Sequence, residues 1–237
     1  MKMLIGFLVL FPIYICPGLS RNEYIENTNP TQYFVAGSAF TLHGGTFQYK
    51  NTCLFLSSLT LGLTDNVSFG VSTEFYRLIV TTDKDRSPSM YLLTPKIGFQ
   101  LAPKLHVAVG GDVVFYREHL FDEEVYTGTK TAGLGYALLT YGTINNNLTV
   151  GCYAVPIKKR INEKGSFFNV SGIQKIGRKV SLVGESWFFP DKSKIIDGGF
   201  RFLGNRAAVD LGMACSLGIN NDFIDTMMPY FDYTWSF

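Results

Sequence analysis

The stretch RAAVDLGMACSLG, residues 206–218, alternates between two kinds of side chain with a period of two residues. In an extended strand one face would be apolar, with Ala207, Val209, Leu211, Met213, Cys215 and Leu217. The opposite face would be small and polar, with Arg206, Ala208, Asp210, Gly212, Ala214 and Ser216. A soluble sheet would carry many Lys and Glu side chains on that second face. Small residues with isolated charges instead favour a strand of a closed barrel, with lipid outside and a narrow polar interior.

The same alternation recurs along the chain, for example in TPKIGFQLA at 94–102 and LHVAVGGDVVFY at 105–116. Hydrophobic residues make up 46% of the sequence and charged residues 17%, which is below the roughly 25% usual in soluble domains. The formal net charge of +2 argues against a nucleic-acid partner, because such proteins carry clustered Lys and Arg.

Short connections rich in Asn, Asp, Gly or Pro lie at 64–66, 102–104, 144–147, 176–179 and 203–206. Longer polar connections lie between them, at 81–89, 117–130, 157–166, 190–194 and 217–225. This alternation is typical of outer-membrane barrels, which have short periplasmic turns and longer outer loops. The predicted fold class is therefore all-β: a transmembrane antiparallel up-and-down β-barrel, formed by a single domain over residues 21–237.

The spacing of these connections predicts about twelve strands. They are expected over residues 32–42, 50–63, 67–78, 94–102, 104–117, 129–144, 148–157, 166–176, 179–189, 195–203, 206–218 and 227–237. The first span alternates poorly and could instead enter the lumen or pack beneath it, and ten strands are the structural alternative.

Both ends of the chain predict export to the outer membrane of a Gram-negative bacterium. Residues 1–20 read as a signal peptide, with Lys2, an apolar run and small residues before a cut after Ser20. At the other end, four alternating aromatic residues share one strand face: Phe231, Tyr233, Trp235 and Phe237. A terminal aromatic strand of this kind resembles the signal that outer-membrane proteins present to the barrel-assembly machinery, where a free strand can pair with an open edge. Expected partners are that machinery, outer-membrane lipids and lipopolysaccharide; the oligomeric state is left open.

Four further stretches are NPTQYFVAGSAFTL (29–42), QYKNTCLFLSSLTLGLTDNVSFGV (48–71), YGTINNNLTVG (141–151) and VSLVGESWFF (180–189). Together they resemble an uncharacterised outer-membrane β-barrel family of Bacteroidetes-type bacteria. The resemblance covers most of the chain after the signal peptide, and it implies location and fold without an activity.

Six charged residues project inward by the period of two and are the candidates for lining a pore: Glu74, Lys96, Asp112, Glu185, Arg201 and Asp210. A Lys or Arg in lipid would cost on the order of 2–4 kcal/mol at the midplane, which supports the inward assignment. These charges can line a passive porin-like channel for small polar solutes. Alternatively, they can pair across a filled barrel with a structural or surface-binding role.

A membrane-bound hydrolase is the least favoured alternative, and the chain is expected not to be an enzyme. His43, His106 and His119 lie in no recognisable Ser/His motif. Glu118, Asp122, Glu123 and Glu124 lack the spacing of a calcium loop, and Cys53, Cys152 and Cys215 form no zinc motif. Neither a metal nor a cofactor is therefore expected.

Overall fold

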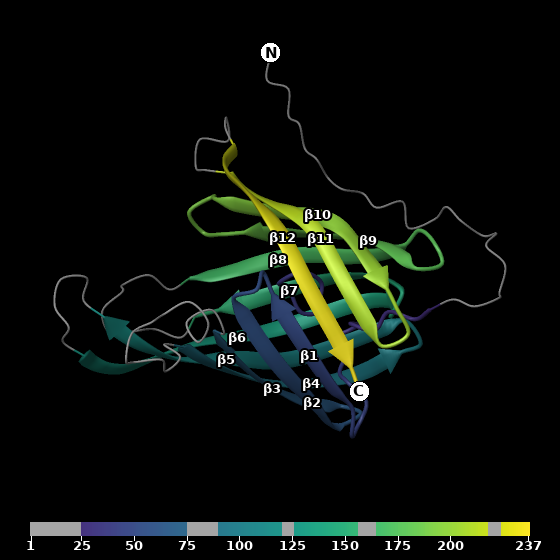
Figure 1. Cartoon of the computed structure of the whole chain (residues 1–237), viewed down its shortest axis with the longest axis horizontal. Coiled ribbons are helices and arrows are strands. Elements are labelled where there is room, and N and C mark those ends of the chain that lie inside the picture. The colour runs from purple at the N-terminus through teal and green to yellow at the C-terminus, as the bar shows by residue number, and fades with distance from the viewer. Residues whose placement is uncertain (1–24, 75–89, 120–125, 156–164, 218–223) are drawn as a thin grey trace, which may run out of the picture.

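The computed structural model describes residues 25–74, 90–119, 126–155, 165–217 and 224–237. These residues form a closed antiparallel barrel of twelve strands, as the sequence predicts (Figure 1). The strands are β1 (Phe47–Thr52), β2 (Leu56–Thr64), β3 (Val67–Glu74), β4 (Met90–Ala102), β5 (Leu105–His119), β6 (Tyr126–Thr143), β7 (Asn146–Ala154), β8 (Ser166–Lys175), β9 (Val180–Phe188), β10 (Lys194–Leu203), β11 (Ala207–Leu217) and β12 (Ile224–Ser236). Within the described ranges, no helix is long and apolar enough to cross a membrane.

The barrel closes where the first strand meets the last. β1 pairs with β12 in antiparallel register, from Gln48 opposite Ser236 to Thr52 opposite Asp232. Every other strand pairs with its neighbours in chain order, so each sheet edge is occupied at the closure. A closed sheet leaves no free edge along its circumference, which is the condition for a β-structure to lie in lipid.

The two ends of the barrel differ in their connections. All five short turns expected from the sequence are present at one end, called here the turn end, where Phe237 also lies. The strand ends that the longer connections join lie at the opposite end, called here the loop end. The expected signal peptide, together with the long connections around 81–89 and 157–164, lies outside the described residues.

Two predicted strand spans are wrong, although the total of twelve is right. Residues 32–42 form no strand and lie inside the barrel, which is the alternative that their poor alternation leaves open. The span 50–63 is two strands, β1 and β2, joined at the loop end by Cys53–Phe55. The strict alternation of short and long connections therefore fails at this hairpin.

The faces of the strands follow the predicted alternation. On β11, the Leu211 side chain is 46% exposed, whereas the next residue inward, Asp210, is 2% exposed. On β12, Phe231, Trp235 and Phe237 are exposed, whereas Asp232 and Thr234 are buried. Large apolar side chains thus cover the outside of these strands and polar side chains face the inside, which is the inverse of a soluble protein.

This inversion predicts opposite tolerance for a lysine on the two faces of β11. Leu211→Lys should destabilise the inserted barrel by about 2–4 kcal/mol, because the ammonium would face lipid. Ala214→Lys is the matched control, since residue 214 faces inward and lies opposite Asp197 on β10. The urea midpoint of each refolded variant in lipid vesicles measures the effect. Equal losses in the two variants would contradict the assignment of the faces.

Candidate functional site: a lumen closed by the N-terminal segment

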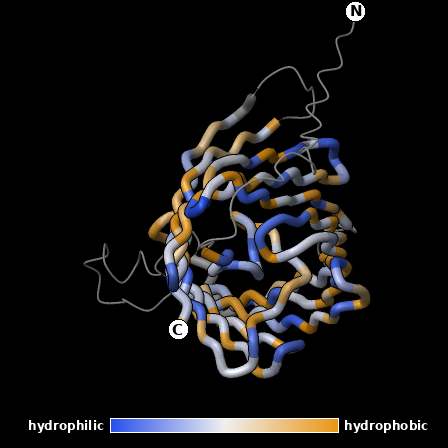
Figure 2. The backbone as a smooth tube through the Cα atoms, turned by 90° about the vertical axis from the view of Figure 1, so that its right-hand side faces the viewer, coloured by the Kyte–Doolittle hydropathy of each residue, from blue (hydrophilic) through white to orange (hydrophobic). Residues whose placement is uncertain are grey.

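Residues 25–46, called here the lumenal segment, enter the barrel and return. Figure 2 shows that part of the chain lies inside the ring of strands. At its centre the segment folds back on itself: the Ser38 N–H donates to the Thr31 carbonyl at 3.0 Å, and the Tyr33 N–H to the Ala36 carbonyl at 2.9 Å. Tyr33, Phe34 and Ala36 are fully buried at the tip of this hairpin. The segment therefore occupies the space that an open porin would leave to water.

Both feet of the hairpin are fixed at the turn end. On the entering side, the Thr28 carbonyl accepts hydrogen bonds from Gln48 Nε2 at 2.8 Å and from Ser236 Oγ at 2.9 Å. On the returning side, the Gly44 N–H donates to Asp65 Oδ1 at 3.0 Å. That N–H, together with the His43 ring, holds the pKa of Asp65 below its usual value. The segment thus enters and leaves through the same end.

Gly62 on β2 allows the returning chain to lie against the wall. A Cβ at this position would lie 2.1 Å from the His43 carbonyl oxygen, far inside contact distance. Gly45 next to it has a φ of 80°, a conformation that favours glycine. Two glycines, one in the wall and one in the segment, therefore permit this close approach.

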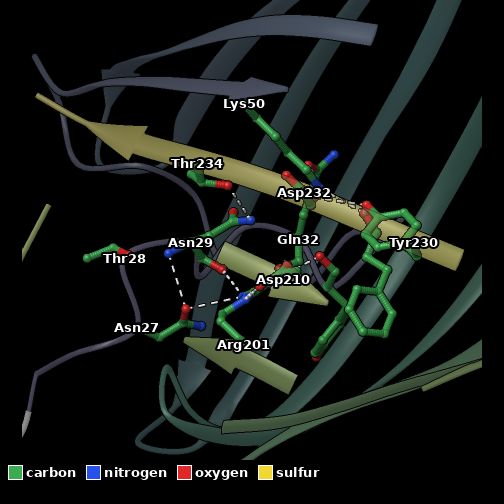
Figure 3. Close-up of polar contacts among 12 residues, drawn as sticks. Asn27, Thr28, Asn29, Gln32, Lys50, Arg201, Asp210, Tyr230, Asp232 and Thr234 are labelled. Carbon is green, nitrogen blue, oxygen red and sulfur yellow. Dashed lines mark hydrogen bonds and ion pairs between the residues drawn. The ribbon is translucent and has the colours of Figure 1, made fainter. Parts of the chain in front are cut away.

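Arg201 on β10 is the centre of the contacts between wall and segment (Figure 3). Its side chain is 0% exposed and pairs with Asp210, through Nε and Nη2 at 2.8 Å each. The remaining N–H groups donate to the segment: Nη1 to Asn27 Oδ1 and the Asn29 carbonyl, and Nη2 to the carbonyls of Gln32 and Tyr33. A bidentate ion pair in the wall thereby fixes the backbone of the segment.

Glu185 on β9 also binds the tip of the hairpin, but as a negatively charged acceptor of backbone N–H groups. Its Oε1 accepts the backbone N–H groups of Phe34 at 2.5 Å, Val35 at 2.9 Å and Ala36 at 3.1 Å. The indole Nε1 of Trp187 donates to Oε2 at 3.1 Å. Three successive N–H groups that converge on one carboxylate form an anion-binding nest.

Two lysines bind carbonyl groups of the segment. Lys50 on β1 donates to the Phe34 carbonyl at 2.8 Å and pairs with Asp232 on β12 at 2.6 Å. Lys96 on β4 donates to the carbonyls of Thr31 at 3.3 Å and Ser38 at 3.2 Å. The two lysines hold different parts of the hairpin, Lys50 its tip and Lys96 its base.

Apolar contacts at the tip are few and local. Phe34 packs on Tyr230 of β12 with ring centroids 4.8 Å apart, and the Tyr230 hydroxyl donates to the Phe34 carbonyl at 2.6 Å. Ile173 and Val183 complete this small cluster. A second apolar cluster joins Ala39 of the segment to Ala108 and Leu138 of the wall.

The structure places the six predicted lumenal charges as follows. Lys96, Glu185, Arg201 and Asp210 are buried inside the barrel, and the first three bind the segment directly. Asp112 lines a cavity beside the segment, and Glu74 ends β3 at the loop end. Instead of lining an open path, most of these charges therefore contact protein.

Three further charged side chains of the described residues are buried in the lumen and were not predicted there: Lys50, Asp197 and Asp232. Asp197 shares the inward face of β10 with Arg201, so the period of two could have identified it. Asp232 lies on the polar face of the last strand, but its partner Lys50 is brought to it only by barrel closure. The ring of charges is thus larger than predicted.

The other residues considered for catalysis or metal binding lie apart from one another. His43 faces Asp65 at the turn end, and the His106 ring packs on Phe40 at 4.6 Å; the side chain of His119 and the cluster 122–124 lie outside the described part. Among the described residues, no group of three or more His, Cys, Asp or Glu side chains could hold a metal ion.

The described chain is thus a twelve-stranded barrel of the outer-membrane type with an occupied lumen. No protein-family model and no curated protein matches the sequence. Among solved structures, the KdgM porin, also determined in complex with disordered oligogalacturonate, has a TM-score of 0.50 at 7% identity and covers 81% of this chain and 98% of that one. At this identity the likeness concerns the fold alone.

Two more distant structures have TM-scores below that of KdgM. The outer-membrane expressed OmpT of Vibrio cholerae has a TM-score of 0.41 at 12% identity, over 87% of this chain and 71% of that chain. The toluene transporter TbuX of Ralstonia pickettii has a TM-score of 0.42 at 8% identity, over 80% and 67% of the two chains.

Proposed function

We propose that the protein is a porin-type barrel of the outer membrane that its own lumenal segment holds closed, and that it passes small polar solutes only when this segment moves. The observation that carries the proposal is the hairpin 31–38, whose backbone is bound by Arg201, Glu185 and Lys50 of the wall. Charged side chains that bind backbone groups form strong hydrogen bonds, so the closed arrangement is well defined.

The polarity of the wall supports a closure that can be reversed. Many of the side chains buried inside the barrel are charged or hydroxylated, such as Asp232, Thr140 and Thr149. A lumen lined by such groups can be filled by water when the segment leaves, whereas an apolar lumen would gain nothing from hydration. Rings of fixed charge would then determine which solutes pass.

The proposal includes the route to the membrane. Residues 1–20 would direct export, and the outward aromatic face of β12 would present the chain to the barrel-assembly machinery. Lipopolysaccharide would contact the loop end, and the turn end would face the periplasm. The proposed role is not catalytic.

Single-channel conductance in a planar bilayer tests this function. The refolded wild-type protein should show rare or small conductance steps. A variant in which a short glycine–serine linker replaces residues 29–40 should show steady steps, because it lacks the hairpin and keeps the Thr28 carbonyl that Gln48 and Ser236 bind. Asp112→Asn is the control, since this carboxylate makes no hydrogen bond to the segment among the described residues.

Two results would contradict the proposal. Large, steady steps from the wild type would mean that the segment does not close the pore. Silence from an inserted linker variant would favour the filled barrel without transport, which the ion pairs Arg201–Asp210 and Lys50–Asp232 also support.

A further inference from the structure

A cavity of about 160 Å³ lies between the hairpin and the barrel wall. Its lining comes from both, with Gly37 and Val35 of the segment on one side and strands β2 to β7 and β9 on the other. Val35 is 58% exposed although its neighbours at the tip are buried. The closed lumen is thus not completely filled beside the hairpin.

Polar groups around this cavity lack partners. The Tyr153 side chain is 5% exposed, and its hydroxyl makes no hydrogen bond of good geometry although the backbone of Gly37 lies nearby. The Asp112 carboxylate interacts with Lys96 only at a distance and accepts no hydrogen bond within the described part of the chain. Buried polar groups are normally hydrogen-bonded, so an unpartnered hydroxyl at a cavity points to a ligand or to water.

The charges at the cavity exclude strongly charged ligands. Lys96 and Asp112 both line the cavity and carry opposite charges. A cation drawn to Asp112 would meet the ammonium of Lys96, and an anion drawn to Lys96 would meet the carboxylate. Two N–H groups of Lys96 are already directed at the carbonyls of Thr31 and Ser38, whereas the Asp112 carboxylate is an acceptor without a hydrogen bond in the described part of the chain. A neutral ligand that donates hydrogen bonds suits this pair.

Aromatic rings form the other part of the lining. Tyr153 packs against Trp187 with ring centroids 5.1 Å apart and against Tyr136 at 5.8 Å. All three rings line the cavity, and the Thr94 side chain lines it from another strand. Ring faces accept the C–H side of a saturated ring, while hydroxyl and carboxylate groups satisfy its alcohol groups.

We propose that this cavity binds one neutral polyhydroxyl ring of the size of a single sugar, with Asp112 and Tyr153 as its polar contacts and Tyr136 and Trp187 as its aromatic contacts. The volume equals that of about five water molecules at ~30 Å³ each, which is room for one ring and not for an oligomer. The inference goes beyond the proposed channel, because the site exists in the closed state and does not require conduction.

Tryptophan fluorescence measures binding at this site. The chain has two tryptophans, so Trp235→Phe leaves Trp187 in the cavity as the only reporter. Titration of the refolded full chain in detergent with glucose or myo-inositol should give a saturable change in emission. Glucuronate and glucosamine should bind more weakly, because each carries a charge that either Asp112 or Lys96 repels.

Two variants should weaken glucose binding in the same background. Asp112→Asn should weaken it about tenfold or more, since it removes the negative charge and one acceptor oxygen, and Tyr153→Phe by roughly threefold to tenfold, since it removes the hydroxyl. Asp197→Asn is the matched control, because this lumenal carboxylate does not line the cavity, and it should leave the affinity unchanged.

Three outcomes would overturn the site: no saturable change with either neutral ring, tighter binding of a charged derivative, or an affinity for glucose in Asp112→Asn and Tyr153→Phe that equals that of the parent chain. Because the readout is binding and not conductance, failure here leaves the proposed channel untouched, and failure of the conductance test leaves this site untouched.

Discussion

Arg201→Met should destabilise the folded barrel by about 3–5 kcal/mol, one of the two largest effects expected of a single substitution in this chain. Methionine removes every donor that the guanidinium directs to Asp210, Asn29 and Tyr33. The Asp210 carboxylate would then be buried without a cation and directly opposite Asp232 on β12. An uncompensated buried charge is among the few single changes with so large a cost. Urea unfolding of the refolded variant measures it.

A double variant separates the charge from the packing. Arg201→Met combined with Asp210→Leu removes both members of the ion pair, so most of the lost stability should return. Arg201→Lys keeps the charge but not the bidentate geometry, so its stability should lie between that of the wild type and that of Arg201→Met. A loss below about 1 kcal/mol in Arg201→Met would mean that the pair is solvated, which would contradict its burial.

The architecture could be predicted because it depends on local patterns. Alternation places Arg201 and Asp210 on the inner face of adjacent strands, and the register of β10 and β11 sets them directly opposite each other. Asn, Gly and Pro mark the turns at the turn end, for example Asp65–Asn66 and Pro103–Lys104. These signals act over a few residues, so a single sequence contains them.

The β1–β2 hairpin could not be predicted because its turn lacks the usual residues. Cys53 and Leu54 adopt φ values of 52° and 63°, a region that residues other than Gly, Asn and Asp rarely enter. Without a turn signal, residues 50–63 read as one long strand. The barrel closure compensates for this local cost, since the Cys53 N–H donates to the Phe231 carbonyl of β12 at 2.7 Å.

The poor alternation of residues 32–42 allows a place in the lumen, but their composition does not distinguish that place from a strand. These residues are rich in aromatic and small apolar side chains, as an ordinary strand is. Their burial is produced by contacts distant in sequence, such as those of Phe34 with Glu185 and Tyr230. The spacing of apolar residues indicates how many faces of a segment are buried, but it does not indicate which part of the protein covers those faces.

Glu185→Leu should release the tip of the hairpin while the barrel stays folded. The Phe34 and Ala36 N–H groups are buried and would lose their acceptor. Each buried N–H group left without a partner destabilises the bound tip by about 1–3 kcal/mol. Together these losses shift the equilibrium between the bound tip and the released tip by roughly 30-fold to 10⁴-fold toward release. The wall itself gains, because Glu185 lies directly opposite Asp197 on β10 and the substitution removes one of two like charges.

Cysteine labelling at position 36 reports this release. Ala36 is fully buried, so Ala36→Cys, in a chain whose native cysteines are replaced, should react slowly with a bulky maleimide that does not cross membranes. Adding Glu185→Leu should speed the reaction by at least about 30-fold, since the two lost hydrogen bonds set that lower limit. Glu185→Gln keeps an acceptor and should have a smaller effect, and Asp112→Asn should have none. Equal labelling rates in all of these variants would mean that the nest of three N–H groups does not hold the segment, and the closure would then depend on other contacts of the wall, such as those of Arg201, Lys50 and Lys96.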